Sequence, residues 1–283
     1  MRAEAFAKVN FTLEVFGKRA DGYHALRSVV MPISLSDTLD IEVTDDGSIT
    51  SDTGYDDDLC VKAARVLRNN RIIELSNNRN PGATIRVTKR IPAGGGLGGG
   101  SADAAAVLRA LNELWKVGLS REELAEIGAQ VGSDVPSLVM GGSVIMEGRG
   151  EKVTPLFNLQ PSTFNLILVN PGVHSSTKEV YAACEARALS DENATAKMVA
   201  ALGEGDVGKI AAALMNDLQA PAVKLHPEIA DALVSLRTAG VVGAMMSGSG
   251  SSVFGLVENE SEARRISSEM NARGYKAWPV QTL

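Results

Sequence analysis

The chain has 283 residues, a formal net charge of −6, 45% hydrophobic residues and 22% charged residues. This length fits one large domain or two of medium size, and the composition is ordinary for a soluble globular enzyme. The acidic balance argues against a nucleic-acid binder, which usually carries a basic surplus. Cys60 and Cys184 lack the spacing of a metal or redox motif, so we expect two small buried residues, compatible with a reducing cytoplasm.

The first third of the chain predicts mainly strands. Alternating patterns predict strands at residues 3–16, 29–43, 47–52 and 83–91. Asp21 and Gly22 form a hairpin-type turn signal after the first of these strands. Residues 56–70 open with acidic residues and then carry an apolar stripe, which predicts a helix.

Glycine dominates the next segment, where six of the seven residues from Gly94 to Gly100 are glycine. A helix is predicted directly afterwards, over residues 101–115, with Ser101 as its N-cap. Ser120 and Glu123 have the spacing of a capping box, which predicts another helix start. A short helix start in "GSDVPSLVMGG" and a strand at residues 143–148 follow.

The second half has a different character. Two prolines and the lack of periodicity near residues 154–161 place a domain boundary there, giving domains of 1–155 and 156–283. We then predict a strand at 164–171, helices at 177–188, 195–217 and 227–239, strands flanking a glycine loop within 241–257, a helix at 261–273 and a last strand. This order suggests a small α+β sandwich.

The glycine-rich loop before a helix is typical of a phosphate site. Glycine allows the backbone N–H groups to approach a ligand closely, and the helix N-terminus adds unpaired donors and a positive dipole end. A Walker A loop would end in Gly-Lys-Ser/Thr, which is absent here. A dinucleotide fingerprint matches at Gly94, Gly96 and Gly99, but the preceding strand alternates and does not look like a buried parallel strand.

The loop "PAGGGLGGGSADAA" (residues 92–105) resembles the phosphate loop of the GHMP kinases. "AEAFAKVNFTLEV" and "MMSGSGSSVFGL" are similar to the N-terminal and C-terminal motifs of that family, in the right order. The resemblance implies an α+β, two-domain GHMP kinase fold: an N-terminal domain like ribosomal-protein S5 domain 2 and a ferredoxin-like C-terminal domain. It also implies an ATP-dependent small-molecule kinase that uses Mg²⁺ and phosphorylates an alcohol.

One branch of the family is more closely similar, through "RADGYH" (residues 19–24), "GSDVPSLVMGG" and "NPGVHSSTKEVY". That branch phosphorylates the C2 hydroxyl of a cytidine-diphosphate sugar alcohol in the non-mevalonate route to isoprenoid precursors. Three alternatives stay open at this point. One is a GHMP kinase for mevalonate or homoserine, and another is a non-catalytic nucleotide-binding module on the same fold. A Rossmann oxidoreductase is a remote third.

The resemblance assigns two catalytic residues. Phosphoryl transfer to an alcohol needs a group that orients the hydroxyl and takes its proton, and by resemblance this base is Asp134. The alternative is that Asp134 is only a helix N-cap. Lys8 would lie beside it and orient the carboxylate, although an exposed strand lysine is an equally ordinary interpretation from sequence.

The resemblance also implies the binding residues. Tyr23 would stack on cytosine, His24 would bind its edge, Tyr181 would be the second aromatic, and Asn10 and Thr177 would contact the rest of the substrate. A surface aromatic and a solvated imidazole are the ordinary alternative for Tyr23 and His24.

ATP would lie along the glycine loop, with its adenine near Lys89. The implied loop contacts are Pro92, Ala93, Gly94, Gly95, Gly96, Leu97, Gly98, Gly99, Gly100, Ser101 and Ala102. The protein ligands of Mg²⁺ are not apparent from the sequence. We expect no nucleic-acid partner, no membrane segment, a cytoplasmic location, and a monomer or homodimer.

Overall fold

The computed structural model describes residues 1–72, 81–156, 163–185 and 194–283. The strands in these ranges are β1 (Arg2–Asn10), β2 (Thr12–Lys18), β3 (His24–Thr44), β4 (Ile49–Ser51), β5 (Gly82–Thr88), β6 (Val144–Gly148), β7 (Lys152–Pro155), β8 (Asn165–Asn170), β9 (Met215–Asn216), β10 (Gly243–Met246), β11 (Val253–Val257) and β12 (Lys276–Gln281). The helices are α1 (Leu59–Leu67), α3 (Gly99–Leu114), α4 (Arg121–Gly128), α5 (Val135–Met140), α6 (Thr177–Ala182), α7 (Ala194–Glu204), α8 (Val207–Ala213), α9 (Gln219–Leu225), α10 (Glu228–Thr238) and α11 (Glu260–Ala272), with a π-helical turn η1 (Arg68–Ile72) after α1.

The larger sheet has eight strands and is organised by the 21-residue strand β3. β3 pairs antiparallel with β1, β2, β5 and β6 at different parts of its length. The hairpin between β2 and β3 turns at Gly22, which has a φ of +84°, and Asp21 accepts a hydrogen bond from the Tyr23 backbone N–H. The Asp21-Gly22 turn prediction is therefore confirmed.

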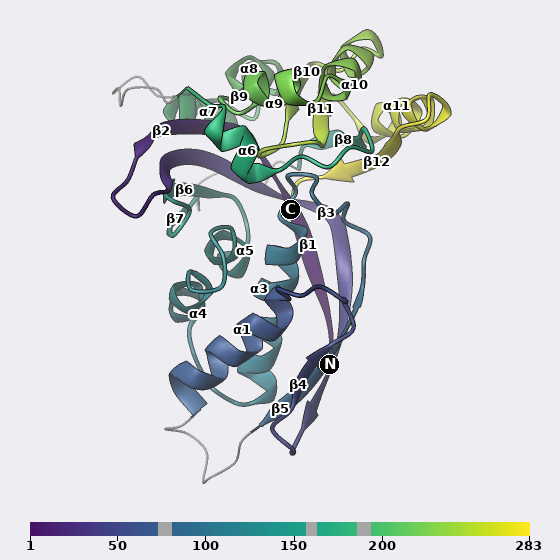
Figure 1. Ribbon diagram of the computed structural model, residues 1–283. Helices are drawn as coiled ribbons and strands as arrows, with labels where there is room; N and C mark the ends of the chain where they lie inside the picture. Colours follow the sequence, from purple (N-terminus) through teal and green to yellow (C-terminus); the bar gives the residue numbers. More distant parts are fainter. Residues whose placement is uncertain (73–80, 157–162, 186–193) are drawn as a thin grey trace.

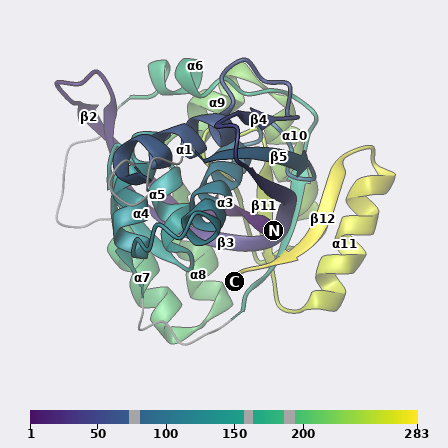
Figure 2. The same cartoon turned by 90° about the horizontal axis from the view of Figure 1, so that it is seen from below.

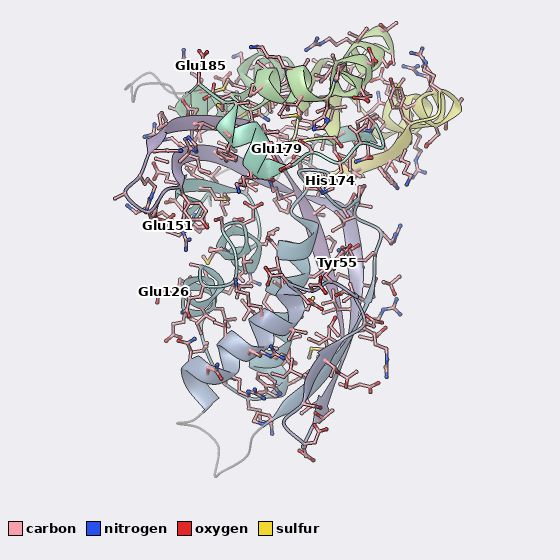
Figure 3. The ribbon with its side chains drawn as sticks, viewed as in Figure 1. Tyr55, Glu126, Glu151, His174, Glu179 and Glu185 are labelled. Carbon is pink, nitrogen blue, oxygen red and sulfur yellow. The ribbon has the colours of Figure 1, made fainter. Side chains whose placement is uncertain are left out.

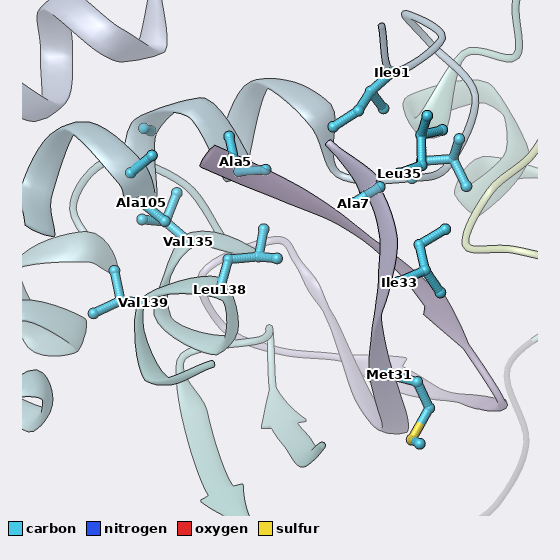
Figure 4. Close-up of a cluster of buried hydrophobic side chains, with 14 of the residues drawn as sticks. Ala5, Ala7, Met31, Ile33, Leu35, Ile91, Ala105, Val135, Leu138 and Val139 are labelled. Carbon is cyan, nitrogen blue, oxygen red and sulfur yellow. The ribbon is translucent and has the colours of Figure 1, made fainter. Parts of the chain in front are cut away.

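Helices α1, α3, α4 and α5 pack beside this sheet and close its core (Figure 1). The alternating apolar side chains of β1 supply Ala5 and Ala7, both fully buried, and Ala105 of α3 lies in the same cluster (Figure 4). Small residues at these positions let the helix approach the strand closely. Val135 at the start of α5 belongs to the same core, so the packing of this core fixes the position of that helix.

The smaller sheet has four strands in the order β10-β11-β8-β12, all antiparallel. Helices lie between β8 and β10, and α11 lies between β11 and β12. Figure 2 shows α11 and β12 together at one side of the molecule. Along the chain the order is strand, helix, strand, strand, helix, strand, and β11 and β8 lie at the centre of the sheet. This arrangement is a ferredoxin-like sandwich, as predicted.

Both hydrophobic core clusters contain residues from the two halves of the chain. Leu26 of β3 and Val144 of β6 pack in the same cluster as Ile167 of β8 and Leu218. β2 also pairs in parallel with β9, which comes from the second half of the chain. The boundary predicted near residues 154–161 falls partly outside the described residues, and the division at 155/156 stays a prediction.

Several predicted element boundaries were wrong; for example, the segment 195–217 predicted as helical divides into α7, α8 and the strand β9. The single strand predicted at 3–16 is divided at Phe11, whose backbone N–H donates to Val29 O. The helix predicted from Ser101 begins earlier, at Gly99, because Gly98 takes a φ of +68° and occupies the N-cap position. The helix predicted at 177–188 ends at Ala182, and residues 186–188 lie outside the described ranges. The capping box of Ser120 and Glu123 is confirmed.

The uncharged segment 239–257 does not form one helix. It supplies β10 and β11 and the glycine-serine loop that joins them. Across the described ranges, no helix combines the length and apolar character needed to cross a lipid bilayer.

Candidate active site

A cavity of about 820 Å³ lies where the glycine loop, the β2–β3 hairpin, α5 and α6 meet. Both halves of the chain contribute to its walls. The residues that line it are Lys8, Asn10, Leu13, Lys18, Gly22, Tyr23, His24, Leu26, Pro92, Gly94, Gly95, Gly96, Leu97, Gly98, Ser101, Ser133, Asp134, Met146, Arg149, Thr177, Lys178, Tyr181, Ala182, Gly248 and Ser249. Its size is in the range of small-molecule sites.

Lys8 and Asp134, predicted as the catalytic pair, lie together in this cavity. The Lys8 Nζ is 3.6 Å from Asp134 Oδ2 and donates a 2.7 Å hydrogen bond to Asn10 Oδ1. The Lys8 side chain is 5% exposed, so its charge is nearly removed from solvent and depends on these partners. Asn10 in turn donates to Ser28 Oγ at 2.8 Å, which fixes its carbonyl oxygen toward the lysine.

Asp134 occupies the N-cap position of α5, but its side chain accepts no capping hydrogen bond. Its backbone is in the right-handed helical region (φ −85°, ψ −14°), whereas a capping residue is usually extended. Pro136, near the start of the helix, has no N–H that would need a cap. The carboxylate is therefore directed to the cavity and Lys8, and the alternative of a simple N-cap is not supported.

The glycine loop interlocks with the loop between β10 and β11. Gly94, Gly96 and Gly98 have φ values of +63°, +73° and +68°, which favour glycine. Ser247 Oγ donates to Gly96 O at 3.0 Å. A Cβ on Gly96 would lie 2.1 Å from Ser247 O, so the two backbones are too close for any side chain there.

The loop residues predicted to bind nucleotide divide into two groups. Those that line the cavity are Pro92, Gly94, Gly95, Gly96, Leu97, Gly98 and Ser101. Those that do not are Ala93, Gly99, Gly100 and Ala102. Ala102 is 1% exposed and belongs to the hydrophobic core, so its contact with a nucleotide is not supported by its position.

Lys89 is part of a charge cluster below the loop. Its Nζ is 2.5 Å from Asp37 Oδ2 and 2.6 Å from Asp103 Oδ2. Asp37 also accepts from the backbone N–H groups of Arg90 and Ile91, which start the loop. Lys89 does not line the cavity, and its contact with adenine stays a prediction. The structure shows it joining the start of the loop to α3.

Asp103 is a buried carboxyl group of this cluster with a raised pKa. Burial, opposed by Lys89 and assisted by the charge of Asp37, raises its pKa from 3.8 to about 7. Its Oδ1 is buried and has no hydrogen-bond partner among the described residues. A lysine between two carboxylates leaves one negative charge uncompensated, and that charge favours protonation.

We predict that Asp103→Asn changes the pH dependence of stability. Because the pKa of Asp103 is raised on folding, the folded state binds more protons between about pH 4 and 7, and stability is lost as the pH rises through this window. The Tm of the wild-type protein should therefore fall relative to that of Asp103→Asn between pH 5 and 7, and the two curves should run parallel above pH 8. Parallel curves throughout would contradict the raised pKa.

The aromatic residues of the predicted substrate site lie on the hairpin and on α6. The rings of His24 and Tyr181 stack with centroids 5.6 Å apart and planes 29° apart. The guanidinium of Arg149 lies 5.3 Å from the centroid of the Tyr23 ring, which is 53% exposed. Tyr181 thus stacks on His24 in this structure, where the sequence predicted it as one side of a base sandwich. Burial, with the charge of Asp134, raises the pKa of Tyr181 well above its usual range.

Several cavity residues were missed by the sequence analysis. Arg149 and Lys178 bring positive charge to the hairpin side of the cavity. Ser249 Oγ lies 2.9 Å from Thr177 Oγ1, which joins the start of α6 to the second glycine loop. Lys178 follows the predicted Thr177 directly, so its position was a usable signal, whereas nothing in the local sequence singled out Arg149.

Figure 3 labels two acidic residues near this region, Glu151 and Glu179 of α6. Glu151 pairs with Arg19 of the hairpin at 3.2 Å. His174, to which no role was given, lies beside the glycine loop: a Cβ on Gly94 would be 2.4 Å from its ring. His174 therefore packs against the loop backbone.

The fold and the site define a small-molecule kinase. Residues 58–142 match the GHMP kinases N terminal domain, and residues 198–276 match the GHMP kinases C terminal domain. The chain belongs to the GHMP kinase family, whose members phosphorylate small alcohols with ATP.

Within the family, the chain is similar to 4-diphosphocytidyl-2-C-methyl-D-erythritol kinase. The Pelotomaculum thermopropionicum protein of that name is 43% identical over 93% of this chain and 91% of its own length. A crystal structure of 4-(cytidine 5'-diphospho)-2C-methyl-D-erythritol kinase is 32% identical and has a TM-score of 0.84, covering 100% of this chain and 99% of that one. Homoserine kinase from Cytophaga hutchinsonii, at 19% identity and a TM-score of 0.77 over 100% of this chain and 94% of its own, shows the shared fold alone.

Proposed function

We propose that this kinase transfers the γ-phosphoryl group of ATP to the C2 hydroxyl of 4-diphosphocytidyl-2-C-methyl-D-erythritol, in the non-mevalonate route to isoprenoid precursors. The observation that carries the proposal is the position of the Lys8–Asp134 pair, in one cavity with the glycine loop on one side and Tyr23, His24 and Tyr181 on the other. The similarity to kinases of that name supports the choice of substrate.

Asp134 is the base in this proposal. Its carboxylate accepts the proton of the attacking hydroxyl as that oxygen forms a bond to phosphorus and the bond to the β-phosphate oxygen breaks. Lys8, held by Asn10, keeps the carboxylate in place and offsets negative charge on the transferring group. The pair needs little rearrangement because both side chains are already adjacent in the cavity.

The glycine loop would bind the phosphates of ATP. Its backbone N–H groups and the N-terminus of α3 offer donors and a positive dipole end to an anion. Ser101 lines the same cavity and can add its hydroxyl.

Mg²⁺ commonly binds through phosphate oxygens and only one or two protein groups. The described residues contain no cluster of three His, Cys, Asp or Glu side chains that could hold a metal ion, and the Ser101 hydroxyl in the cavity would be one oxygen ligand beside the phosphates. The ion would neutralise phosphate charge.

The cytidine end would bind at the hairpin. Tyr23 is exposed at the cavity rim with Arg149 on its ring, and a base can stack on such a surface. His24 and Tyr181 form the adjoining aromatic wall, and the hydroxyl of Thr177 is fixed by Ser249. Mevalonate and homoserine have no base that could use these rings.

The substrate is tested by measuring ADP release with Mg·ATP and four acceptors in parallel. These are 4-diphosphocytidyl-2-C-methyl-D-erythritol, mevalonate, homoserine and galactose. We expect turnover of the cytidine compound alone. Turnover of another acceptor would support the assignment as a kinase and contradict the proposed substrate. ATP binding without turnover of any acceptor would favour a nucleotide-binding module.

Tyr23→Ala should weaken substrate binding and leave the chemical step largely intact. Loss of one base-stacking surface costs about 1–3 kcal/mol, so KM for the cytidine substrate should rise about 5–150-fold with kcat changed little. Tyr23→Phe should behave nearly as the wild type. Tyr55→Ala is the matched control, because Tyr55 is similarly exposed at 58% and does not line the cavity. An unchanged KM in Tyr23→Ala would show that Tyr23 is only a surface residue.

A further inference from the structure

A second cavity, of about 330 Å³, lies behind the proposed active site. Lys8 lines both cavities. Residues of α5 line the second cavity, whereas the first reaches only Asp134, directly before that helix. The second cavity is lined by Phe6, Lys8, Val30, Pro32, Ala102, Arg109, Arg121, Ser137, Leu138, Val139, Gly141, Gly142 and Leu283. The proposed reaction gives this cavity no role.

Two arginines from different helices meet at this cavity. Arg109 of α3 donates from Nη1 to Leu138 O at 2.7 Å, and Arg121, the first residue of α4, donates from Nη1 to Met140 O at 2.9 Å. Each guanidinium has five N–H donors, so each uses one contact to the end of α5 and keeps donors for another partner. The Arg109 nitrogens that make no hydrogen bond are not fully buried, and the Arg121 side chain is exposed, so both keep donors that a ligand can reach.

The charges around these arginines are not balanced. Across the described ranges, neither Arg109 nor Arg121 forms an ion pair with a carboxylate, and no Asp or Glu side chain lines the cavity. Burial, and then the neighbouring charge of Arg121, lower the pKa of Arg109. Arg109 is half-buried and Arg121 is exposed, so one end of the cavity carries two cations without a carboxylate partner, in a chain with a net charge of −6.

Capping of α5 does not account for this arrangement. α5 has six residues, and a cation at the end of a helix is favourable, but one arginine would suffice for that purpose. The second adds like-charge repulsion, which a bound anion would offset. Planar guanidinium groups are well suited to bind phosphate through two parallel hydrogen bonds.

Apart from Lys8 and Ser137, the rest of the wall is mostly apolar. Phe6 and Pro32 lie on the sheet side, and Leu138 lies on α5, where Figure 4 shows it next to Val139 and across from the β1 alanines. A cavity with a cationic end and an apolar wall is complementary to a small amphipathic anion. We propose that this cavity is a second binding site for a phosphate monoester with a short hydrocarbon chain, recognised by Arg109 and Arg121.

Pentyl phosphate is a suitable probe for the test. Binding is measured by titration calorimetry at low ionic strength with saturating Mg·ADP, which occupies the glycine loop and removes competition there. We expect one binding event for pentyl phosphate, weaker binding of inorganic phosphate, and no binding of pentan-1-ol. Equal affinity for the alcohol would overturn anion recognition, and equal affinity for inorganic phosphate would overturn the role of the apolar wall.

Arg121→Gln is the decisive variant, because this side chain is exposed and its loss is less disruptive to folding than that of Arg109. We expect its affinity for pentyl phosphate to fall at least about tenfold relative to the wild-type protein. The affinity of Arg121→Lys should lie between those of the wild type and Arg121→Gln. Arg237→Gln on α10 is the control for general loss of positive charge. Unchanged affinity in Arg121→Gln, or no binding to the wild-type protein, would overturn the site. Neither measurement requires the proposed acceptor, so this test and that of the proposed function fail independently.

Discussion

Asp134→Asn should lower kcat by about 10²–10⁴-fold, with ATP binding retained. This range is the usual contribution of a positioned general base. Asparagine has nearly the same shape as aspartate but cannot accept the proton, and it removes the partner of the Lys8 charge 3.6 Å away. The comparison needs kcat with the cytidine substrate and, separately, the affinity for a fluorescent ADP analogue.

The control for this variant is Asp231→Asn on α10, an acidic residue on a helix away from the cavity, which should keep full activity. Lys8→Met should also lower kcat, and the double variant should lose less than the product of the two single effects, because the residues act on one step. If Asp134→Asn retained most of its kcat, Asp134 would not be the base, and the pair would serve only to hold α5 against β1.

Gly96→Ala is expected to destabilise the protein by about 2–5 kcal/mol and to abolish activity. A left-handed backbone costs a non-glycine residue about 1–2 kcal/mol, and overpacking typically costs about 1–3 kcal/mol more. Here the new Cβ would lie 2.1 Å from Ser247 O and 3.0 Å from Gly250 N, so the second glycine loop would have to move. Urea denaturation gives the loss of stability, and the ADP-release assay gives the loss of activity.

Variants at two further glycines separate the cost of backbone strain from the cost of the steric clash. Gly172→Ala has the same backbone strain, with φ +83°, but no atom lies within 4 Å of its Cβ. Its stability should therefore fall only by the strain cost of about 1–2 kcal/mol. Gly100→Ala lies in α3 with its nearest neighbour at 3.5 Å and should be tolerated or slightly stabilising. Equal losses in Gly96→Ala and Gly172→Ala would show that contact between the two loops contributes nothing.

The sequence predicted the main architecture because its signals are local. Alternation defined the strands, and the Asp21-Gly22 turn and the Ser120 capping box are both short-range patterns. The start of α3 was mispredicted because a serine after glycines has the composition of an N-cap, whereas the actual cap is the left-handed backbone of Gly98. The conformation of Gly98 depends on the hydrogen bonds of the loop with Lys8 and Ser247, which are distant in sequence.

Site residues could be predicted from the sequence only where they belong to a recognisable motif. Lys8 and Asp134 were chosen by resemblance, and their proximity across 126 positions could not come from spacing. Lys89 was assigned to adenine, but its partners Asp37 and Asp103 are brought to it by β3 and α3. Arg149 was missed because its contact with Tyr23 depends on how the segment after β6 folds back on the hairpin.

Strand β3 has a consequence for how this protein can vary. It carries His24 at one end and Asp37 further along, so one strand passes from the proposed substrate side to the charge cluster beside the glycine loop. Its pairing with β1 shifts register between Pro32 and Ser36. On either side of this irregularity the side chains alternate between faces, and inserting a single residue would reverse every later position. Functional relatives should therefore keep the length of this strand fixed, and insertions and deletions should collect in the hairpin and the surface loops.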